Sequence, residues 1–199
     1  MPNAMPNAMP NAMPNAMPNE ARRWLWILLL TVASVFVTLG MACATPFAAL
    51  ATLAALHMSR RDGLSLIAIA WVADQAVGYG LLQYPRTVSS FAWGVSLGAG
   101  AFMALLAARA LADRLRDRGG VVAGAGAFAG AFVAYQAALF AATAGLASGS
   151  EAFSLPIVGW VLGVNLLSLA GLLILYRLAV WIGLVTREPL GARATVTAG

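Results

Sequence analysis

Long apolar segments, separated by short polar ones, follow one another along most of this chain. A helix needs about 20 apolar residues to cross the hydrocarbon core of a bilayer, and most of these segments reach that length. Segment 47–58 is shorter and starts directly after Pro46, which predicts a helical hairpin whose second arm is short or partly tucked into the protein. The whole pattern predicts an all-α polytopic membrane protein, a bundle of six transmembrane helices at residues 24–41, 47–58, 64–83, 91–111, 121–146 and 155–185.

The arginines orient this bundle. The chain contains no lysine, and with the N-terminus inside, nine arginines fall in inner segments and one, Arg86, falls in an outer loop. Cytoplasmic loops carry an excess of basic residues, and here the excess alternates from loop to loop as six spans require. Both termini are therefore expected in the cytoplasm. The inner arginines are Arg22, Arg23, Arg60, Arg61, Arg114, Arg116, Arg118, Arg187 and Arg193.

The composition excludes several classes of protein. Hydrophobic residues make up 61% of the chain and charged residues 10%, whereas soluble domains are about half apolar and about one quarter charged. A soluble enzyme, a nucleic-acid-binding domain and a disulfide-stapled secreted module are therefore excluded. The single cysteine, Cys43, also rules out an intrachain disulfide.

The chain divides into three parts. Residues 1–20 repeat the tetrapeptide MPNA and end in MPNE. This repeat has too little apolar surface to offset the entropy of ordering, so we expect a disordered extension. Residues 21–186 form the six-helix transmembrane domain, and residues 187–199 are expected to be a flexible cytoplasmic tail.

Small residues recur at four-residue spacing in several segments, which allows close packing of helices in lipid. Ala48, Ala51 and Ala55, on the short second helix, are the best candidates for contact with a partner helix. Packing between helices of this same chain is the alternative explanation. Glycine pairs with the same spacing are Gly94/Gly98, Gly126/Gly130 and Gly159/Gly163.

Polar side chains inside the apolar segments need an explanation, because ionisable groups at mid-membrane are costly to insert. Asp74 lies halfway along segment 64–83, and three neutral polar residues of that segment recur at every fourth position. If the polar faces of segments 64–83, 121–146 and 155–185 converge, the outer half of the bundle contains a polar cavity for a small ligand. Alternatively, these polar side chains form hydrogen bonds between helices that only hold the bundle together. The candidate substrate-binding residues are Asp74, Gln75, Tyr79, Gln83, Arg86, Tyr135, Gln136 and Asn165.

No catalytic set emerges from the sequence. His57, Cys43 and Asp74 differ in predicted depth, and the glycine clusters lack the Lys and Ser/Thr of a phosphate-binding loop. We therefore expect no enzyme activity, no covalently bound cofactor and no nucleic-acid partner. Cys43, in the turn of the first hairpin, is a candidate ligand for a soft metal or for the metal of a corrinoid; alternatively it is a small residue in a tight turn.

Three stretches carry a resemblance to a known family. CATPFAAL at 43–50, WVADQAVGYG at 71–80 and YPRT at 84–87 are similar to bacterial membrane proteins described as permease components of cobalt transport. The architecture of residues 22–185 resembles the substrate-binding (S) subunits of energy-coupling-factor transporters for vitamins and metals.

This resemblance implies six helices that enclose a ligand beneath outer loops, here 42–45, 83–90 and 147–154. It implies a transported vitamin such as a cobalamin-type corrinoid, or a cobalt-type metal. It also implies a separate transmembrane coupling subunit and ATPases as partners in the bacterial inner membrane. The small-residue motifs give a different expectation, a non-catalytic accessory or assembly subunit of a larger membrane complex.

Overall fold

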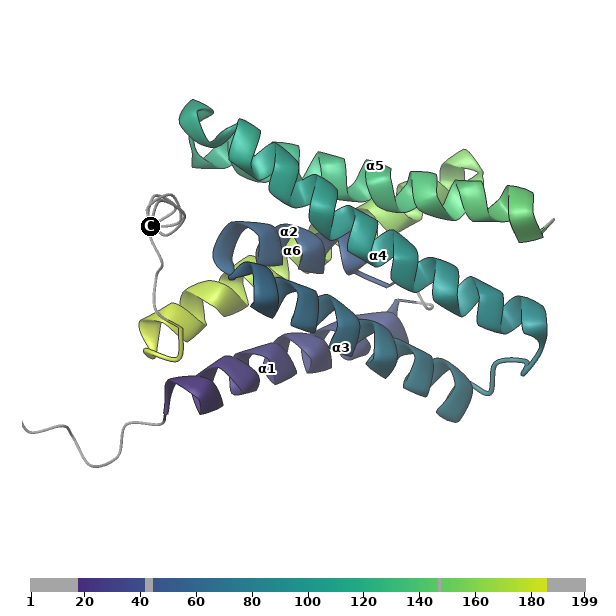
Figure 1. Ribbon diagram of the computed structural model, residues 1–199, viewed down its shortest axis with the longest axis horizontal. Helices are drawn as coiled ribbons and strands as arrows, with labels where there is room; N and C mark the ends of the chain where they lie inside the picture. The colour runs from purple at the N-terminus through teal and green to yellow at the C-terminus, as the bar shows by residue number, and fades with distance from the viewer. Residues whose placement is uncertain (1–17, 42–44, 147, 186–199) are drawn as a thin grey trace, which may run out of the picture.

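The computed structural model describes residues 18–41, 45–146 and 148–185, and all regular secondary structure in this part of the chain is helical. The helices are α1 (Asn19–Gly40), α2 (Phe47–His57), α3 (Arg60–Gly80), α4 (Val88–Arg114), α5 (Gly120–Leu146) and α6 (Leu155–Trp181), with short 3₁₀ turns at Arg116–Arg118 and Ser150–Phe153 (Figure 1). The all-α class is thereby confirmed. Because α1 begins at Asn19, the last two residues of segment 1–20 are helical, which corrects its predicted disorder there.

Four helices, α1, α4, α5 and α6, are long and apolar enough to cross a membrane. α3 is of similar length but carries a more polar sequence, and α2 is too short to cross on its own. Four potential spans are therefore established, while the count of six spans stays a prediction. The predicted tail at 187–199 lies outside the described residues.

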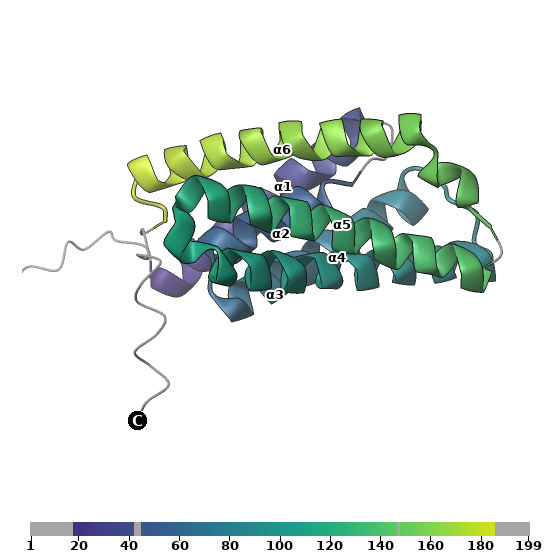
Figure 2. The same cartoon turned by 90° about the horizontal axis from the view of Figure 1, so that it is seen from above.

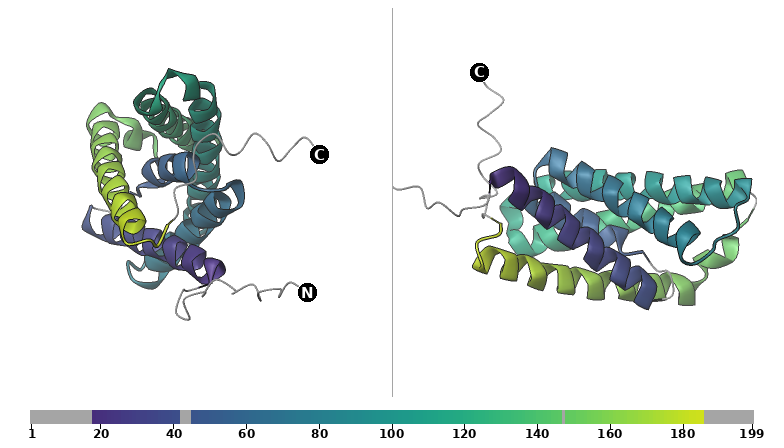
Figure 3. Two further views of the ribbon diagram at one scale, coloured as in Figure 1. Left: turned by 90° about the vertical axis from the view of Figure 1, so that its left-hand side faces the viewer. Right: turned by 90° about the horizontal axis from the view of Figure 1, so that it is seen from below.

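The short helix α2 lies in the middle of the bundle. Figure 3 shows α2 surrounded by other helices, and it contacts α3, α4, α5 and α6. Every residue from Phe47 to Ala55 is buried. Most of these residues are alanines, whose small side chains let four neighbouring helices approach a single central one. The predicted short, tucked-in second arm of the hairpin is confirmed.

Glycines on α4 and α5 accept large side chains from neighbouring helices. A Cβ atom on Gly98 would lie 2.8 Å from the ring of Trp71 on α3, and one on Gly94 would overlap Gln75. Gly130 of α5 makes a similar close contact with Leu111 of α4, and Gly126 with Leu115, which directly follows α4; these two helices run side by side (Figure 2). These glycine pairs therefore pack helices of the same chain.

Gly98→Leu is expected to lower the free energy of unfolding by about 1–3 kcal/mol, the usual cost of overpacking. The new side chain displaces Trp71, whose indole nitrogen donates to the Gly94 carbonyl at 2.8 Å. Thermal unfolding in detergent, followed by circular dichroism, measures the change. Gly145→Leu is the matched control, since its Cβ meets nothing within 4 Å; equal stability of the two variants would contradict this packing.

One end of the bundle, where α1, α3 and α5 begin and α2, α4 and α6 end, gathers most of the arginines. We call it the arginine-rich end (Figure 1). The described residues there include Arg22, Arg23, Arg60, Arg61, Arg114, Arg116 and Arg118, whereas Arg86 lies in the α3–α4 connection at the opposite end. The assignment of the arginine-rich end to the cytoplasm stays a prediction from this charge distribution.

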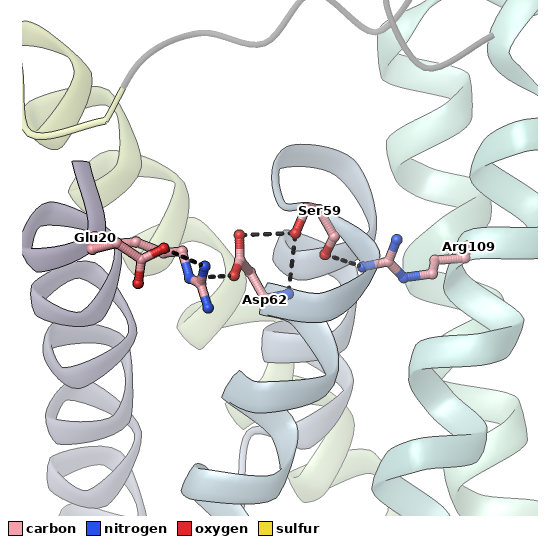
Figure 4. A network of polar contacts seen from close by, with 5 residues as sticks. Glu20, Ser59, Asp62 and Arg109 are labelled. Atoms are coloured by element: carbon pink, nitrogen blue, oxygen red, sulfur yellow. Dashed lines mark hydrogen bonds and ion pairs between the residues drawn. The ribbon is translucent and has the colours of Figure 1, made fainter. Parts of the chain in front are cut away.

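Polar contacts tie the helices together at the arginine-rich end (Figure 4). Arg23 of α1 lies 2.8 Å from the carboxylate of Asp62 and 3.2 Å from that of Glu20. Ser59 caps α3 by accepting a hydrogen bond from the Asp62 amide, and Arg109 of α4 donates to the Ser59 carbonyl at 2.9 Å. The network connects α1, α3 and α4 at one level.

Candidate functional site

The first turn of α2 lies deep inside the protein. α2 rises only about 16 Å, against about 33 Å for α1. Its last residue, His57, lies toward the arginine-rich end, so the N-terminus of α2 falls about halfway along the bundle (Figure 1). Helix N-termini carry partial positive charge and unpaired N–H groups, so this mid-depth position is chemically distinctive.

Polar side chains from α5 and α6 surround this N-terminus. The hydroxyls of Tyr135 and Thr45 lie 3.2 Å apart, and the Tyr135 ring packs against Phe47 with ring centroids 6.0 Å apart. Asn165, which is fully buried, accepts a hydrogen bond from the Ala49 amide at 3.2 Å. The side chain of Asn165 therefore caps α2 from another helix.

Two further amides at this N-terminus, those of Phe47 and Ala48, find no hydrogen-bond acceptor among the described residues. Both residues are fully buried. The first turn of a helix always leaves such donors, but they are usually satisfied by side chains or water. The arrangement can accept an oxygen atom or an anionic group of a ligand.

Asp74 of α3 lies within electrostatic range of the Tyr135 hydroxyl. Its carboxylate is partly buried and accepts a hydrogen bond from the Gln75 side chain at 3.2 Å. Tyr135, Thr45 and Asn165 thus come from three different parts of the chain to the N-terminus of α2, and Asp74 is linked to them through its electrostatic interaction with Tyr135. We call these four residues the mid-bundle polar cluster.

The other polar residues of α3 face elsewhere. Gln75 packs over Gly94, while Tyr79 lies 3.1 Å from the Ser90 hydroxyl and stacks on Phe91 at a centroid distance of 4.8 Å. Gln83 lies beyond the end of the helix, with φ of 53°, and its side chain donates back to the Gly80 carbonyl. Of the three neutral polar residues predicted to share one face, Gln75 and Tyr79 therefore pack against α4, and Gln83 lies in the turn after α3.

The remaining predicted residues are more scattered. Arg86 is exposed in the α3–α4 connection, and Gln136 is half-buried on α5. Ala48, Ala51 and Ala55 are buried against helices of this same chain, so contact with a partner helix would require the bundle to open. Cys43 lies outside the described residues. In the part of the chain that is described, no three His, Cys, Asp or Glu side chains gather as metal ligands.

Sequence reasoning missed two contributors to these contacts. Trp71 precedes Gln75 by one helical turn and packs with it on the glycines of α4. Ser90 forms a hydrogen bond with the Tyr79 hydroxyl, in which either oxygen can be the donor. Trp71, Gln75 and Tyr79 recur at four-residue spacing, and so do Gly94 and Gly98. These two matching patterns were the sequence feature that could have predicted the packing of α3 on α4.

Two cavities lie along α1 rather than at the mid-bundle polar cluster. The first, of about 180 Å³, is an apolar groove between α1 and α6 with Pro46 at its base. The second, of about 350 Å³, lies at the arginine-rich end and includes Arg22, His57 and Asp62 in its lining. None of the eight predicted substrate-binding residues lines either cavity.

The four long apolar helices place this chain in the class of multi-pass helical membrane proteins. Comparison with protein-family models, with curated proteins and with solved structures finds no match.

Proposed function

We propose that this chain is a membrane-embedded substrate-binding subunit that takes up a small solute together with separate energising subunits. The observation that carries the proposal is the buried N-terminus of α2 beside the mid-bundle polar cluster. Non-helical backbone at membrane depth is tolerated where it is buried in protein or lines a cavity. In transporters, helices that begin near the bilayer midplane direct their N-termini at substrate groups.

Asp74 and Tyr135 contribute different hydrogen-bonding groups to this site. An ionised Asp74 accepts hydrogen bonds, whereas the hydroxyls of Tyr135 and Thr45 both donate and accept. The amides of Phe47 and Ala48, which find no acceptor among the described residues, add donors. A ligand with both amide-like and carboxylate-like groups, such as a vitamin, matches this combination. Following the family resemblance, we propose a cobalamin-type corrinoid or a cobalt-type metal as substrate, and a coupling subunit with ATPases as partners in the bacterial inner membrane.

Equilibrium binding of cobalamin and of Co²⁺ to the purified chain tests this proposal. We expect saturable binding of one of the two, weakened at least about tenfold by Asp74→Asn, since a hydrogen bond to a charged group contributes about 1.5–3 kcal/mol. Gln83→Ala is the control, because Gln83 is exposed and, among the described residues, its side chain bonds within its own turn.

Absence of binding for both probes, or binding that Asp74→Asn leaves unchanged, would overturn the assigned substrate class. Binding of cobalamin also allows the role proposed for Cys43 to be tested separately from that of Asp74. Ligation of the corrin cobalt by its thiolate alters the visible absorption spectrum, and Cys43→Ser is expected to abolish that change while the contacts of Asp74 remain.

A specific observation favours a second function, that of an accessory subunit in a larger membrane complex. An outer face of α5 carries exposed residues at every fourth position, and most of them are alanine or glycine. These residues are Val121, Ala125, Ala129, Val133, Ala137, Ala141 and Gly145. A face of this kind lets a second helix approach closely in lipid. Loss of a co-purifying protein in Ala129→Leu combined with Ala137→Leu would support this function.

A further inference from the structure

The seam between α1 and α6 is only loosely closed. α1 packs mainly against α3, and α6 packs mainly against α2, so the two helices face each other without an extensive contact of their own. The apolar groove lies on this seam, and the polar cavity lies toward the arginine-rich end, between α1, the α2–α3 connection and Leu184 and Val185, which follow α6. We call the cavity at the arginine-rich end the polar compartment and the groove between α1 and α6 the apolar compartment. They follow one another along α1.

The polar compartment carries positive charge. The Arg23 guanidinium is neutralised by Glu20 and Asp62. Arg22, by contrast, donates only to the carbonyl oxygens of Leu184, at 3.2 Å, and Gly183, and forms no ion pair with a carboxylate of the described residues. Arg60 and Arg61 are exposed nearby at the start of α3. The charge of Arg22 is thus available to an anion in the cavity.

The apolar compartment has the character of a lipid chain site. Val37 of α1 and Leu167, Leu172 and Leu175 of α6 form its walls. The groove is open at Gly171, where a Cβ atom would meet nothing within 4 Å. Trp26, which lines the polar compartment, packs against Tyr176 of α6, with ring centroids 6.2 Å apart.

The spacing of the two compartments matches one leaflet of a bilayer. From Arg22 to Ala33, where the groove begins, α1 rises about 17 Å. Half of the hydrocarbon core is about 15 Å thick. An anionic headgroup at Arg22 would therefore allow an acyl chain to reach the groove.

We infer that the α1–α6 seam binds one anionic phospholipid, with its phosphate at Arg22 and an acyl chain between α1 and α6. The charge at one end and the apolar walls at the other select an amphiphile rather than a free anion, since basic pockets between transmembrane helices on the cytoplasmic side hold acidic headgroups. This site is separate from the mid-bundle polar cluster and does not depend on the function proposed there.

Native mass spectrometry of the full chain tests the inference, after exchange into mixed micelles that contain equal amounts of phosphatidylglycerol and phosphatidylcholine. We expect one retained phosphatidylglycerol per chain. Arg22→Gln keeps a donor for the carbonyls of Gly183 and Leu184 but removes the charge, and is expected to reduce retention about fivefold. Gly171→Leu fills the groove and is expected to reduce retention of both lipids.

Gly163→Leu and Arg86→Ala are the matched controls. A Cβ on Gly163 also meets nothing within 4 Å, but Gly163 is outside the groove, and Arg86 is at the opposite end of the bundle. Both controls should retain lipid as the wild type does. Equal retention of the two lipids, or retention that Gly171→Leu does not change, would overturn the inference, as would a lipid-free dimer that Gly171→Leu dissociates.

Discussion

Ala51→Phe is expected to lower the free energy of unfolding by about 3 kcal/mol, the largest single effect expected in this chain. Ala51 is fully buried at the centre of the bundle, and α2 contacts four helices around it. A phenyl ring has no space there unless at least one of these helices moves outward, and well-packed interiors accommodate such shifts poorly. Thermal unfolding in detergent and size-exclusion chromatography report the loss of folded protein.

The same substitution on the outside of the bundle is the control. Ala125 of α5 is exposed, so Ala125→Phe places its ring among lipid or detergent chains. Its stability should stay within about 0.5 kcal/mol of the wild type. If Ala51→Phe behaved in the same way, α2 would not be the central helix, and the mid-depth position of its N-terminus would be wrong.

Asn165→Leu is expected to lower the free energy of unfolding by about 1–3 kcal/mol, because it leaves the buried Ala49 amide without its acceptor. Leucine has nearly the shape of asparagine, so the effect reports the lost hydrogen bonds rather than lost volume. The second bond, from the Asn165 side chain to the Val161 carbonyl, lies within α6 and adds little to the fold. Circular dichroism during heating measures the change.

Ser168→Ala provides the comparison on the same helix. The Ser168 hydroxyl donates only to the Val164 carbonyl of its own helix, so its removal should cost less than about 0.5 kcal/mol. Equal midpoints for Asn165→Leu and Ser168→Ala would show that Asn165 does not cap α2.

Much of the fold follows from hydropathy alone. The boundaries of the long helices lie within a few residues of the predicted apolar segments, and the shortness of segment 47–58 led directly to a tucked-in helix. The neighbours of that helix did not follow. α2 is apolar on every face, so its sequence has no periodicity that distinguishes a lipid-facing side from a buried one. For this reason the sequence left open whether Ala48, Ala51 and Ala55 contact a partner helix or pack within the chain; in the structure they are buried against helices of this chain.

For the polar residues, too, the sequence did not reveal which helix each side chain contacts. Helical spacing correctly placed Gln75 and Tyr79 on one face of α3, but it carries no information on which helix covers that face. The glycines of α4 decide this, because Gly94 and Gly98 leave room for Gln75 and Trp71. The bond between Asn165 and Ala49 joins residues 116 positions apart, and a backbone amide has no sequence signature that announces its distant acceptor.

A native mass spectrum of the chain, purified in mild detergent without added ligand, tests the proposed substrate-binding function most directly. We predict a small molecule or metal retained at one per chain in the wild type and lost in Asp74→Ala. A bare mass accompanied by a stoichiometric protein partner would contradict the proposal. The mid-bundle polar cluster would then serve only to hold the helices together, and the exposed face of α5 would become the functional surface.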